Sequence, residues 1–224
     1  IMHNRIHMYD NCTHSVPDWI VSISQQFGQL IVREKAEKLV RVAAELKPDV
    51  ITLPETWNTG FFPRENLKEA SDVDLEQTKK LFSRLAKEYR VNIIAGSVAN
   101  CRDEKIYNTA AVFNRDGEVV MEYDKVHLFS PSGEHEYFEH GKNICNFELD
   151  GIPCSLVICY DIRFPELIRS EMLAGSKVQF VVAQWPDTRL LHWDTLNRAR
   201  AIESQSFLCC TNSVGTAGNT KCGG

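Results

Sequence analysis

Short apolar runs alternate along this chain with longer segments whose apolar residues recur every three to four positions. The short runs are typical of buried strands, and the longer segments are typical of helices that pack one face on a sheet. Strands are expected at residues 19–24, 50–53, 92–98, 110–113, 119–121, 156–158, 178–183 and 207–212. Helices are expected at residues 34–46, 75–89, 165–174 and 193–204. This alternation predicts an α/β fold of stacked sheets and helices.

Turn residues support the predicted strand boundaries. Asp116 and Gly117 separate the apolar runs at 110–113 and 119–121. An Asp-Gly pair between two such runs predicts a β-hairpin, because glycine adopts a positive φ without steric cost.

Composition narrows the class of protein. With 224 residues, 43% of them hydrophobic, the chain can bury one substantial core, which predicts one domain. A net charge of −5 argues against a nucleic-acid or anionic-membrane partner. The sequence shows neither an apolar run long enough for a membrane span nor the apolar stretch of a signal peptide. We therefore interpret the eight cysteines as reduced thiols of a cytoplasmic protein, with Cys209 and Cys210 in the core.

Cys159 is the first candidate for chemistry. It ends the apolar run 156–158 and is followed by polar residues and a predicted helix. Open α/β sheets place their active sites at the carboxyl ends of strands. A lone cysteine is more often a buried, inert thiol, so this position alone does not establish a site.

Two further strand ends strengthen the case for Cys159. Glu55 follows the apolar strand at 50–53, and Lys125 follows the strand at 119–121. The thiol is a nucleophile, the carboxylate a base, and the ammonium a group that stabilises negative charge on oxygen. A neighbouring cation is also expected to lower the pKa of the thiol. Together the three residues predict acyl transfer through a covalent thioester.

The segments that carry these residues resemble the Glu-Lys-Cys signature of the nitrilase superfamily, the carbon–nitrogen hydrolases. The resemblance runs from about Trp19 to the end of the chain. The segment 159–166, Cys-Tyr-Asp-Ile-Arg-Phe-Pro-Glu, resembles the omega-amidase branch, as do 134–136 and 183–193. It implies a four-layer α-β-β-α sandwich and hydrolysis of the terminal amide of a small carboxylic acid, such as 2-oxoglutaramate. It implies no cofactor, and we expect no metal site.

The resemblance also implies roles for the residues of the site. Cys159 is the expected nucleophile and Glu55 the general base. Lys125 is expected to stabilise the tetrahedral oxyanion, with the backbone N–H of Tyr160 as the second donor. Glu134 matches the second active-site glutamate of the family, which supports the lysine. His135 is a weaker candidate for a contact with the substrate.

Substrate recognition leaves alternatives open. A guanidinium binds a carboxylate through two hydrogen bonds, so Arg189 and Arg163 are candidates for the distal carboxylate of an omega-amidase substrate. Arg163 is equally a candidate for an ion pair with Glu166 or Asp161. Trp185 follows a predicted strand and is expected either to line the pocket or to belong to the core.

The two ends of the chain depart from the family pattern. Residues 1–18 match nothing recognisable and do not have the composition of a strand, whereas 19–224 form the expected hydrolase domain. The chain stops where the family continues into further strands, which suggests a C-terminally truncated domain whose last strand is 207–212. The family commonly assembles through the helix after the cysteine, here 165–174, so a homodimer or higher homo-oligomer is expected.

Two alternatives to an omega-amidase remain. One is another amidase of the superfamily, or a nitrilase, with the same three catalytic residues. The other is an inactive, truncated homologue that acts as a binding or scaffold protein. The presence of all three catalytic residues argues against this second alternative.

Overall fold

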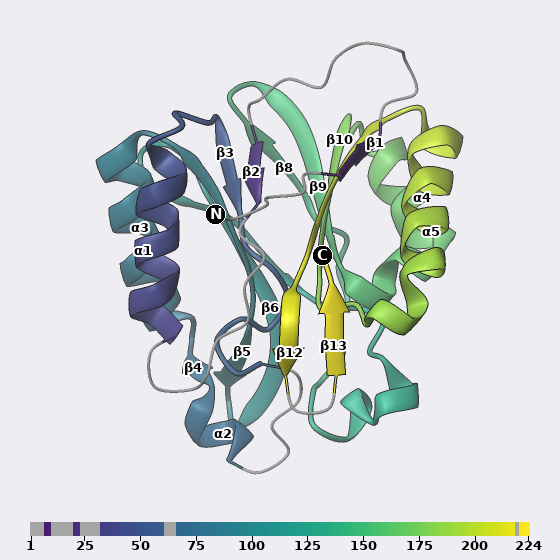
Figure 1. Ribbon diagram of the computed structural model, residues 1–224, viewed down its shortest axis with the longest axis horizontal. Helices are drawn as coiled ribbons and strands as arrows, with labels where there is room; N and C mark the ends of the chain where they lie inside the picture. The colour runs from purple at the N-terminus through teal and green to yellow at the C-terminus, as the bar shows by residue number, and fades with distance from the viewer. Residues whose placement is uncertain (1–6, 10–19, 23–31, 61–65, 218–219) are drawn as a thin grey trace.

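Two β-sheets lie face to face, and helices cover the outer face of each (Figure 1). The computed structural model describes residues 7–9, 20–22, 32–60, 66–217 and 220–224. Helices α1 (Val32–Ala44) and α3 (Glu76–Tyr89) lie on one side, and α4 (Pro165–Leu173) and α5 (Leu190–Ser204) lie on the other. This arrangement confirms the predicted α-β-β-α sandwich.

The sheet beside α1 and α3 has the strand order β2-β3-β5-β6-β7. Its strands are β2 (Ile20–Ser22), β3 (Val50–Thr52), β5 (Asn92–Arg102), β6 (Lys105–Phe113) and β7 (Val119–Asp124). The first three run parallel, and β6 and β7 continue the sheet antiparallel. The short helix α2 (Leu67–Ala70) leads to β4 (Asp72–Val73), which pairs with the end of β5.

The sheet beside α4 and α5 has the order β1-β11-β10-β9-β8. Its strands are β1 (His7–Tyr9), β11 (Phe207–Asn212), β10 (Val178–Ala183), β9 (Ile152–Ile158) and β8 (Asn146–Leu149). The central three run parallel, so their carboxyl ends meet at one edge. A separate hairpin, β12 (Val214–Ala217) and β13 (Thr220–Gly223), follows β11.

Alternation along the strands divides the core into layers. Leu156 and Ile158 face the space between the sheets, whereas Val157 packs with residues of α4 and α5. Cys209 and Cys210 divide in the same way, one on each face of β11. Successive side chains of a strand point to opposite faces, so a strand covered on both sides is apolar throughout. The predicted burial of both cysteines is confirmed.

The structure corrects three expectations about the strands. Residues His7–Tyr9, which lack the composition of a strand, pair antiparallel with β11. The chain also forms the hairpin β12–β13 after 207–212, the run predicted to be the last strand. Finally, β5 and β6 continue beyond their predicted limits to a tight turn at Asp103 and Glu104, both of which have positive φ. The usual signal pairs asparagine or aspartate with glycine, and Glu104 stands where that glycine is expected, so the turn was missed.

The described helices contain no segment that is both long and apolar enough to cross a membrane.

Candidate active site

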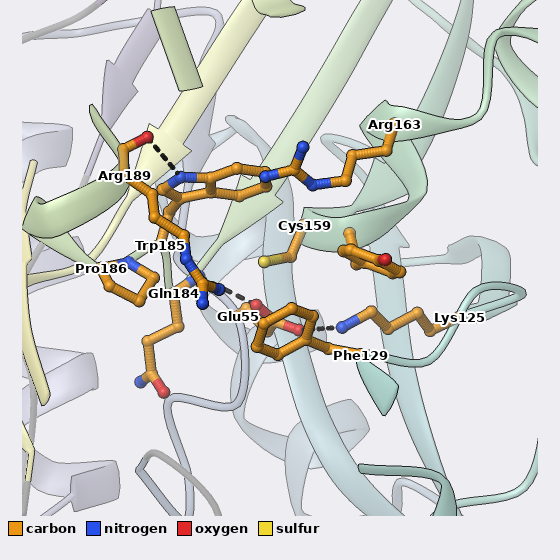
Figure 2. Close-up of a pocket in the computed structure, with 10 residues that line it drawn as sticks. Glu55, Lys125, Phe129, Cys159, Arg163, Gln184, Trp185, Pro186 and Arg189 are labelled. Atoms are coloured by element: carbon orange, nitrogen blue, oxygen red, sulfur yellow. Dashed lines mark hydrogen bonds and ion pairs between the residues drawn. The ribbon is translucent and has the colours of Figure 1, made fainter. Parts of the chain in front are cut away.

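Strand ends from both sheets surround one pocket of about 360 Å³, including its open mouth (Figure 2). Its walls contain three residues with acid–base or nucleophilic chemistry, two arginines, three aromatic rings, a glutamine and a proline. They are Glu55, Lys125, Cys159, Arg163, Arg189, Phe129, Tyr160, Trp185, Gln184 and Pro186. The three residues predicted to carry the chemistry therefore lie in one pocket.

Cys159 occupies a sharp turn directly after β9. It begins the 3₁₀ turn Cys159–Arg163 and has a φ of 49°, in the left-handed region that residues with a side chain rarely adopt. Such backbone is retained when the surrounding structure holds it, and it is common at functional sites. In Figure 2 the sulfur points into the space between Trp185 and Glu55.

The carboxylate of Glu55 is buried and held by three donors. Its Oε1 accepts hydrogen bonds from Lys125 Nζ at 2.8 Å and from Asn108 Nδ2 at 3.0 Å. Its Oε2 accepts the backbone N–H of Gln184 at 2.9 Å. The side chain is therefore fixed from both sheets, because Asn108 belongs to β6 and Gln184 follows β10.

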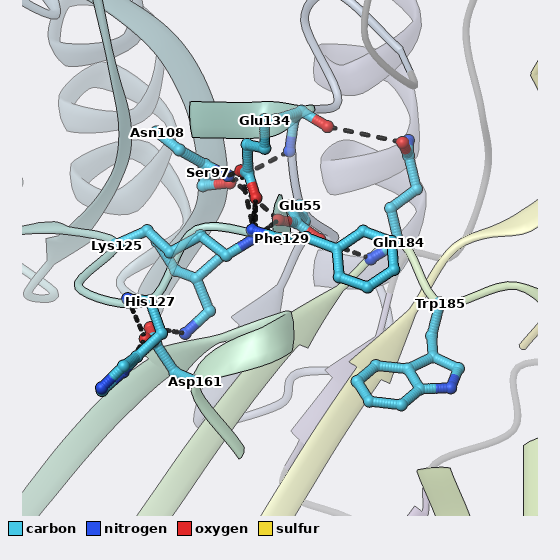
Figure 3. Close-up of polar contacts among 12 residues, drawn as sticks. Glu55, Ser97, Asn108, Lys125, His127, Phe129, Glu134, Asp161, Gln184 and Trp185 are labelled. Carbon is cyan, nitrogen blue, oxygen red and sulfur yellow. Dashed lines mark hydrogen bonds and ion pairs between the residues drawn. The ribbon is translucent and has the colours of Figure 1, made fainter. Parts of the chain in front are cut away.

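Lys125 is enclosed between two carboxylates (Figure 3). Besides Glu55, its Nζ lies 2.9 Å from Oε2 and 3.1 Å from Oε1 of Glu134. The amide of Asn108 joins the two glutamates, since it also donates to Glu134 Oε1 at 3.0 Å. The backbone N–H of Phe129 donates to Glu134 Oε2 at 2.5 Å. Glu134 thus lies where the family resemblance placed it, beside the lysine.

The electrostatic effects on Lys125 and Cys159 follow from burial and charge. Burial alone lowers the pKa of the Lys125 ammonium, but Glu134 and Glu55 together raise it well above its ordinary value, so the lysine is charged. Burial raises the pKa of the Cys159 thiol, and the negative charge of Glu55 raises it further. Lys125 lowers the pKa of the thiol, but by less than burial and Glu55 raise it. The expectation that the cation lowers this pKa is therefore correct for the contribution of Lys125, but the net shift of the thiol pKa is upward.

Two arginines lie on aromatic rings in the pocket. The guanidinium of Arg163 is centred 4.9 Å from the ring of Trp185, and that of Arg189 lies 5.2 Å from the ring of Phe129. Arg163 also hydrogen-bonds to Nδ1 of His192 at 3.2 Å. Trp185 meets both alternatives set out for it, because it lines the pocket and is 3% exposed within the core around α4 and α5.

Asp161 does not serve as the ion-pair partner considered for Arg163. Its buried carboxylate instead accepts hydrogen bonds from Tyr123 and His127. His135 lies exposed on the turn Glu134–Glu136 and does not line the pocket. Tyr160 lines the pocket and packs its ring against Phe129 at 5.0 Å.

The sequence interpretation missed Asn108 and Gln184, and it considered Asp161 only as an ion-pair partner of Arg163. Asn108 lies within a strand, Gln184 acts through its backbone N–H, and Asp161 bonds to residues of another strand. The only local signal was a polar side chain within a strand, at Asn108, or shortly after the end of one, at Asp161. Buried polar groups need partners, so such a position predicts a hydrogen-bonded network without identifying its members.

In the described part of the chain, no three or more His, Cys, Asp or Glu side chains are arranged to hold a metal ion.

Comparison with known proteins agrees with this geometry. The sequence pattern of the carbon–nitrogen hydrolase family matches residues 29–224. A Staphylococcus aureus protein named "Hydrolase in agr operon" is 47% identical over 178 residues, covering 79% of this chain and 68% of that protein. A 2-oxoglutaramate amidase from Bacillus subtilis is 44% identical over 168 residues, covering 75% of this chain and 64% of that protein. This chain therefore spans less than two thirds of that amidase.

A solved structure of the same family has a similar fold. A Xanthomonas campestris protein of the CN-hydrolase superfamily, crystallised with an arsenic adduct in its active site, superposes with a TM-score of 0.78 at 27% identity. The match covers 99% of this chain and 80% of that chain. The chain belongs to the carbon–nitrogen hydrolase family.

Proposed function

We propose that this protein is an omega-amidase, which hydrolyses the terminal amide of a short dicarboxylic acid monoamide such as 2-oxoglutaramate. The observation that carries the proposal is a single pocket that contains Cys159, Glu55 and Lys125 together with two arginines. The first three supply acyl-transfer chemistry, and the arginines supply cations for the distal carboxylate. The similarity to the amidase from Bacillus subtilis supports this substrate class.

Attack on the amide begins with transfer of the thiol proton. Because the raised pKa of Cys159 keeps it protonated, Glu55 must accept the proton from Sγ as sulfur bonds to the carbonyl carbon. The electron pair of the C=O bond moves to oxygen, where the Lys125 ammonium stabilises the charge. The backbone N–H of Tyr160 is proposed as the second donor to this oxyanion.

Release of ammonia and then of the acid completes the cycle. As the tetrahedral intermediate collapses, its C–N bond breaks and Glu55 returns the proton to nitrogen, so ammonia leaves and a thioester to Cys159 remains. Glu55 next takes a proton from water, whose oxygen attacks the thioester carbonyl. The C–S bond then breaks, the thiol regains its proton from Glu55, and the carboxylic acid leaves. Covalent catalysis thus divides one difficult hydrolysis into two easier steps.

Lys125 and Glu134 hold the proposed base in place. The ammonium of Lys125 donates a hydrogen bond to Oε1 of Glu55 at 2.8 Å and so fixes the carboxylate that takes the proton. Glu134 balances the lysine from its other side, at 2.9 Å. We propose that Glu134 keeps the ammonium oriented between the base and the oxyanion.

Ammonia release from 2-oxoglutaramate, compared with butyramide, tests the proposal. Butyramide is a short amide without the distal carboxylate. Release from 2-oxoglutaramate that is faster than from butyramide, and is abolished by Cys159→Ala, is expected. Cooperative thermal unfolding of both proteins serves as the control for folding. No release from folded protein would contradict the omega-amidase assignment, whereas equal release from both amides would indicate an amidase of a different acyl specificity.

We also propose a cytoplasmic homo-oligomer that contacts through α4. Six cysteines of the described residues are free thiols, which suits a reducing compartment: Cys101, Cys145, Cys154, Cys159, Cys209 and Cys210. Leu173, at the end of α4, is 75% exposed and offers apolar surface for a second copy. Light scattering after size-exclusion chromatography would measure the mass in solution. A monomer at micromolar concentration would contradict the oligomer.

A further inference from the structure

We propose that Asp161 is a positioning residue whose carboxylate fixes the turn that carries Cys159 relative to the strand end that carries Lys125. The inference rests on the proposed function only in taking Cys159 as the nucleophile. Asp161 does not line the pocket and is fully buried, so it acts through its neighbours and not by touching the substrate.

The carboxylate of Asp161 accepts four hydrogen bonds. Its Oδ2 accepts the hydroxyl of Tyr123 at 2.8 Å and the backbone N–H of Ile158 at 3.1 Å. Its Oδ1 accepts the backbone N–H of His127 at 2.8 Å and lies 2.9 Å from His127 Nδ1 (Figure 3). Hydrogen bonds to an ionised acceptor are shorter and stronger than neutral ones, so this carboxylate is a rigid junction.

The partners of Asp161 bracket both reactive side chains. Tyr123 and His127 stand two residues before and two residues after Lys125. Ile158 immediately precedes Cys159, and Asp161 itself follows Cys159 by two residues. The Asp161 carboxylate therefore connects the turn around the nucleophile to the segment around the lysine. It binds Tyr123 on one side of Lys125 and His127 on the other.

A second contact joins the same two segments. The ring of His127 stacks on the ring of Phe164, with centroids 3.6 Å apart and an angle of 7° between the planes. Phe164 follows the turn Cys159–Arg163, so the stack lies beside the Asp161 junction. His127 is thereby held from its edge by Asp161 and from its face by Phe164.

The turn at Cys159 needs such support. A φ of 49° is unfavourable for a residue with a side chain, and it persists only where surrounding contacts determine it. The bond from Ile158 N–H to Asp161 Oδ2 closes this turn through a side chain. Loss of the carboxylate would allow the thiol to leave the position from which Glu55 can take its proton.

Asparagine cannot replace Asp161 without loss of a backbone hydrogen bond. Both carboxylate oxygens face a backbone N–H, at Ile158 and at His127. An asparagine side chain has one acceptor oxygen, and its NH₂ group can only donate. One backbone N–H would therefore meet another donor in a fully buried position, whichever way the amide is turned.

The experiment measures alkylation of Cys159 by iodoacetamide, followed by mass spectrometry of the peptide that contains it. This readout requires no amide substrate, so it is independent of whether ammonia is released. Asp161→Asn is compared with Asp72→Asn, a matched control. Asp72 is also a buried carboxylate, accepting bonds from Gln77 N at 3.1 Å and from Thr78 N and Oγ1 at 2.8 and 2.6 Å, and it does not line the pocket.

Asp161→Asn is expected to be alkylated more slowly than the wild type. Its kcat for 2-oxoglutaramate is expected to fall about 100-fold, because displacement of a reacting group by about 1 Å lowers the rate by about that factor. Asp72→Asn is expected to lower the melting temperature while leaving both rates unchanged. The proposal is overturned if Asp161→Asn is alkylated at the wild-type rate, or if Asp72→Asn slows alkylation equally.

Tyr123→Phe keeps the test decisive if Asp161→Asn fails to fold. It removes one of the four bonds and leaves both backbone N–H groups paired. A smaller decrease in alkylation rate and kcat, about tenfold, is expected because one charge-assisted bond is lost and the other three remain. Unchanged rates in Tyr123→Phe would overturn the proposal.

Discussion

The ammonium of Lys125 lies 2.8 Å from Oε1 of Glu55, and side chains of both residues are at most 4% exposed. This contact pairs the proposed base with the proposed oxyanion donor inside the protein. A second glutamate, Glu134, lies 2.9 Å from the same ammonium, so one positive charge serves two carboxylates. The site therefore depends on Lys125 for charge balance as well as for chemistry.

Replacing Lys125 by methionine is expected to abolish ammonia release and to destabilise the fold. Two buried carboxylates, Glu55 and Glu134, would lose their shared cation, and removal of one partner of a buried ion pair costs about 3–5 kcal/mol. Urea denaturation measures this free energy. The control is Lys79→Met, which breaks a half-exposed pair with Glu122 at 2.7 Å. Equal stability of both variants would contradict the dependence on charge balance.

The alkylation rate of Cys159 is expected to rise with pH without a plateau near the ordinary thiol pKa of about 8.5. Burial raises the pKa of this thiol well above its usual range, and the thiolate is the form that reacts. Rates of iodoacetamide modification, measured across the pH range in which the protein stays folded, check this expectation. A plateau below pH 8 would show that Lys125 outweighs burial.

Substitution of Glu55 by glutamine is expected to separate thiol ionisation from catalysis. The negative charge of Glu55 raises the pKa of Cys159, whereas Lys125 lowers it. Glu55→Gln should therefore shift the alkylation profile to lower pH while removing turnover of the amide, since no base remains to take the proton. An unshifted profile would show that the carboxylate does not act on the thiol. Glu148→Gln, at an exposed position, is the control for both measurements.

The fold was largely predictable because its strands are covered on both faces. In β9, Val157 faces the helices and its neighbours Leu156 and Ile158 face the other sheet, so the whole strand is apolar and easily recognised. The strand β1 was missed because edge strands are defined by backbone pairing, here with β11, and not by an apolar pattern. The turn at Asp103 and Glu104 was missed because Glu104 stands where the usual Asp-Gly signal has glycine.

Some residues of the candidate site were predictable from the sequence and others were not. Glu55, Lys125 and Cys159 were recognised because each follows a strand, and strand ends converge in this fold. Asn108 was not, because its importance comes from bridging two glutamates that lie far from it along the chain. The net direction of the pKa of Cys159 also required the structure, since burial and two opposite charges act on it at once.

Arg189 is expected to select substrates that carry a distal carboxylate. Its guanidinium lies over Phe129 in the pocket, and a charge-assisted hydrogen bond contributes roughly 1.5–3 kcal/mol, equivalent to about tenfold or more in KM. Arg189→Met should raise KM for 2-oxoglutaramate and leave KM for butyramide unchanged. Arg163→Met, tested in parallel, shows whether the arginine over Trp185 shares this role. Equal effects on both amides would assign Arg189 to pocket structure.

Glu171 is expected to make stability fall as pH rises from about 5 to 8. Burial raises the pKa of this carboxyl from 4.5 to about 8, against the lowering effect of hydrogen bonds from Gln179 at 3.0 Å and from Cys145 N–H at 3.1 Å, and Asp161 adds a smaller repulsion. Since the native pKa is the higher one, the unfolded chain loses its proton first. The native state therefore loses roughly 3 kcal/mol across this range.

Urea denaturation at pH 5 and pH 8 measures the effect of Glu171. In Glu171→Gln no proton is exchanged at this position, so the contribution of roughly 3 kcal/mol to the difference between the two pH values should disappear. The remaining oxygen of glutamine can still accept the N–H of Cys145. The NH₂ group of the new glutamine would face the amide of Gln179. If that amide turns, its Oε1 can accept a hydrogen bond from this NH₂ group. Gln179 Oε1 is a buried atom that lacks a hydrogen-bond partner among the described residues. A Glu171→Gln variant that loses as much stability between pH 5 and 8 as the wild type would show that other groups set the pH dependence.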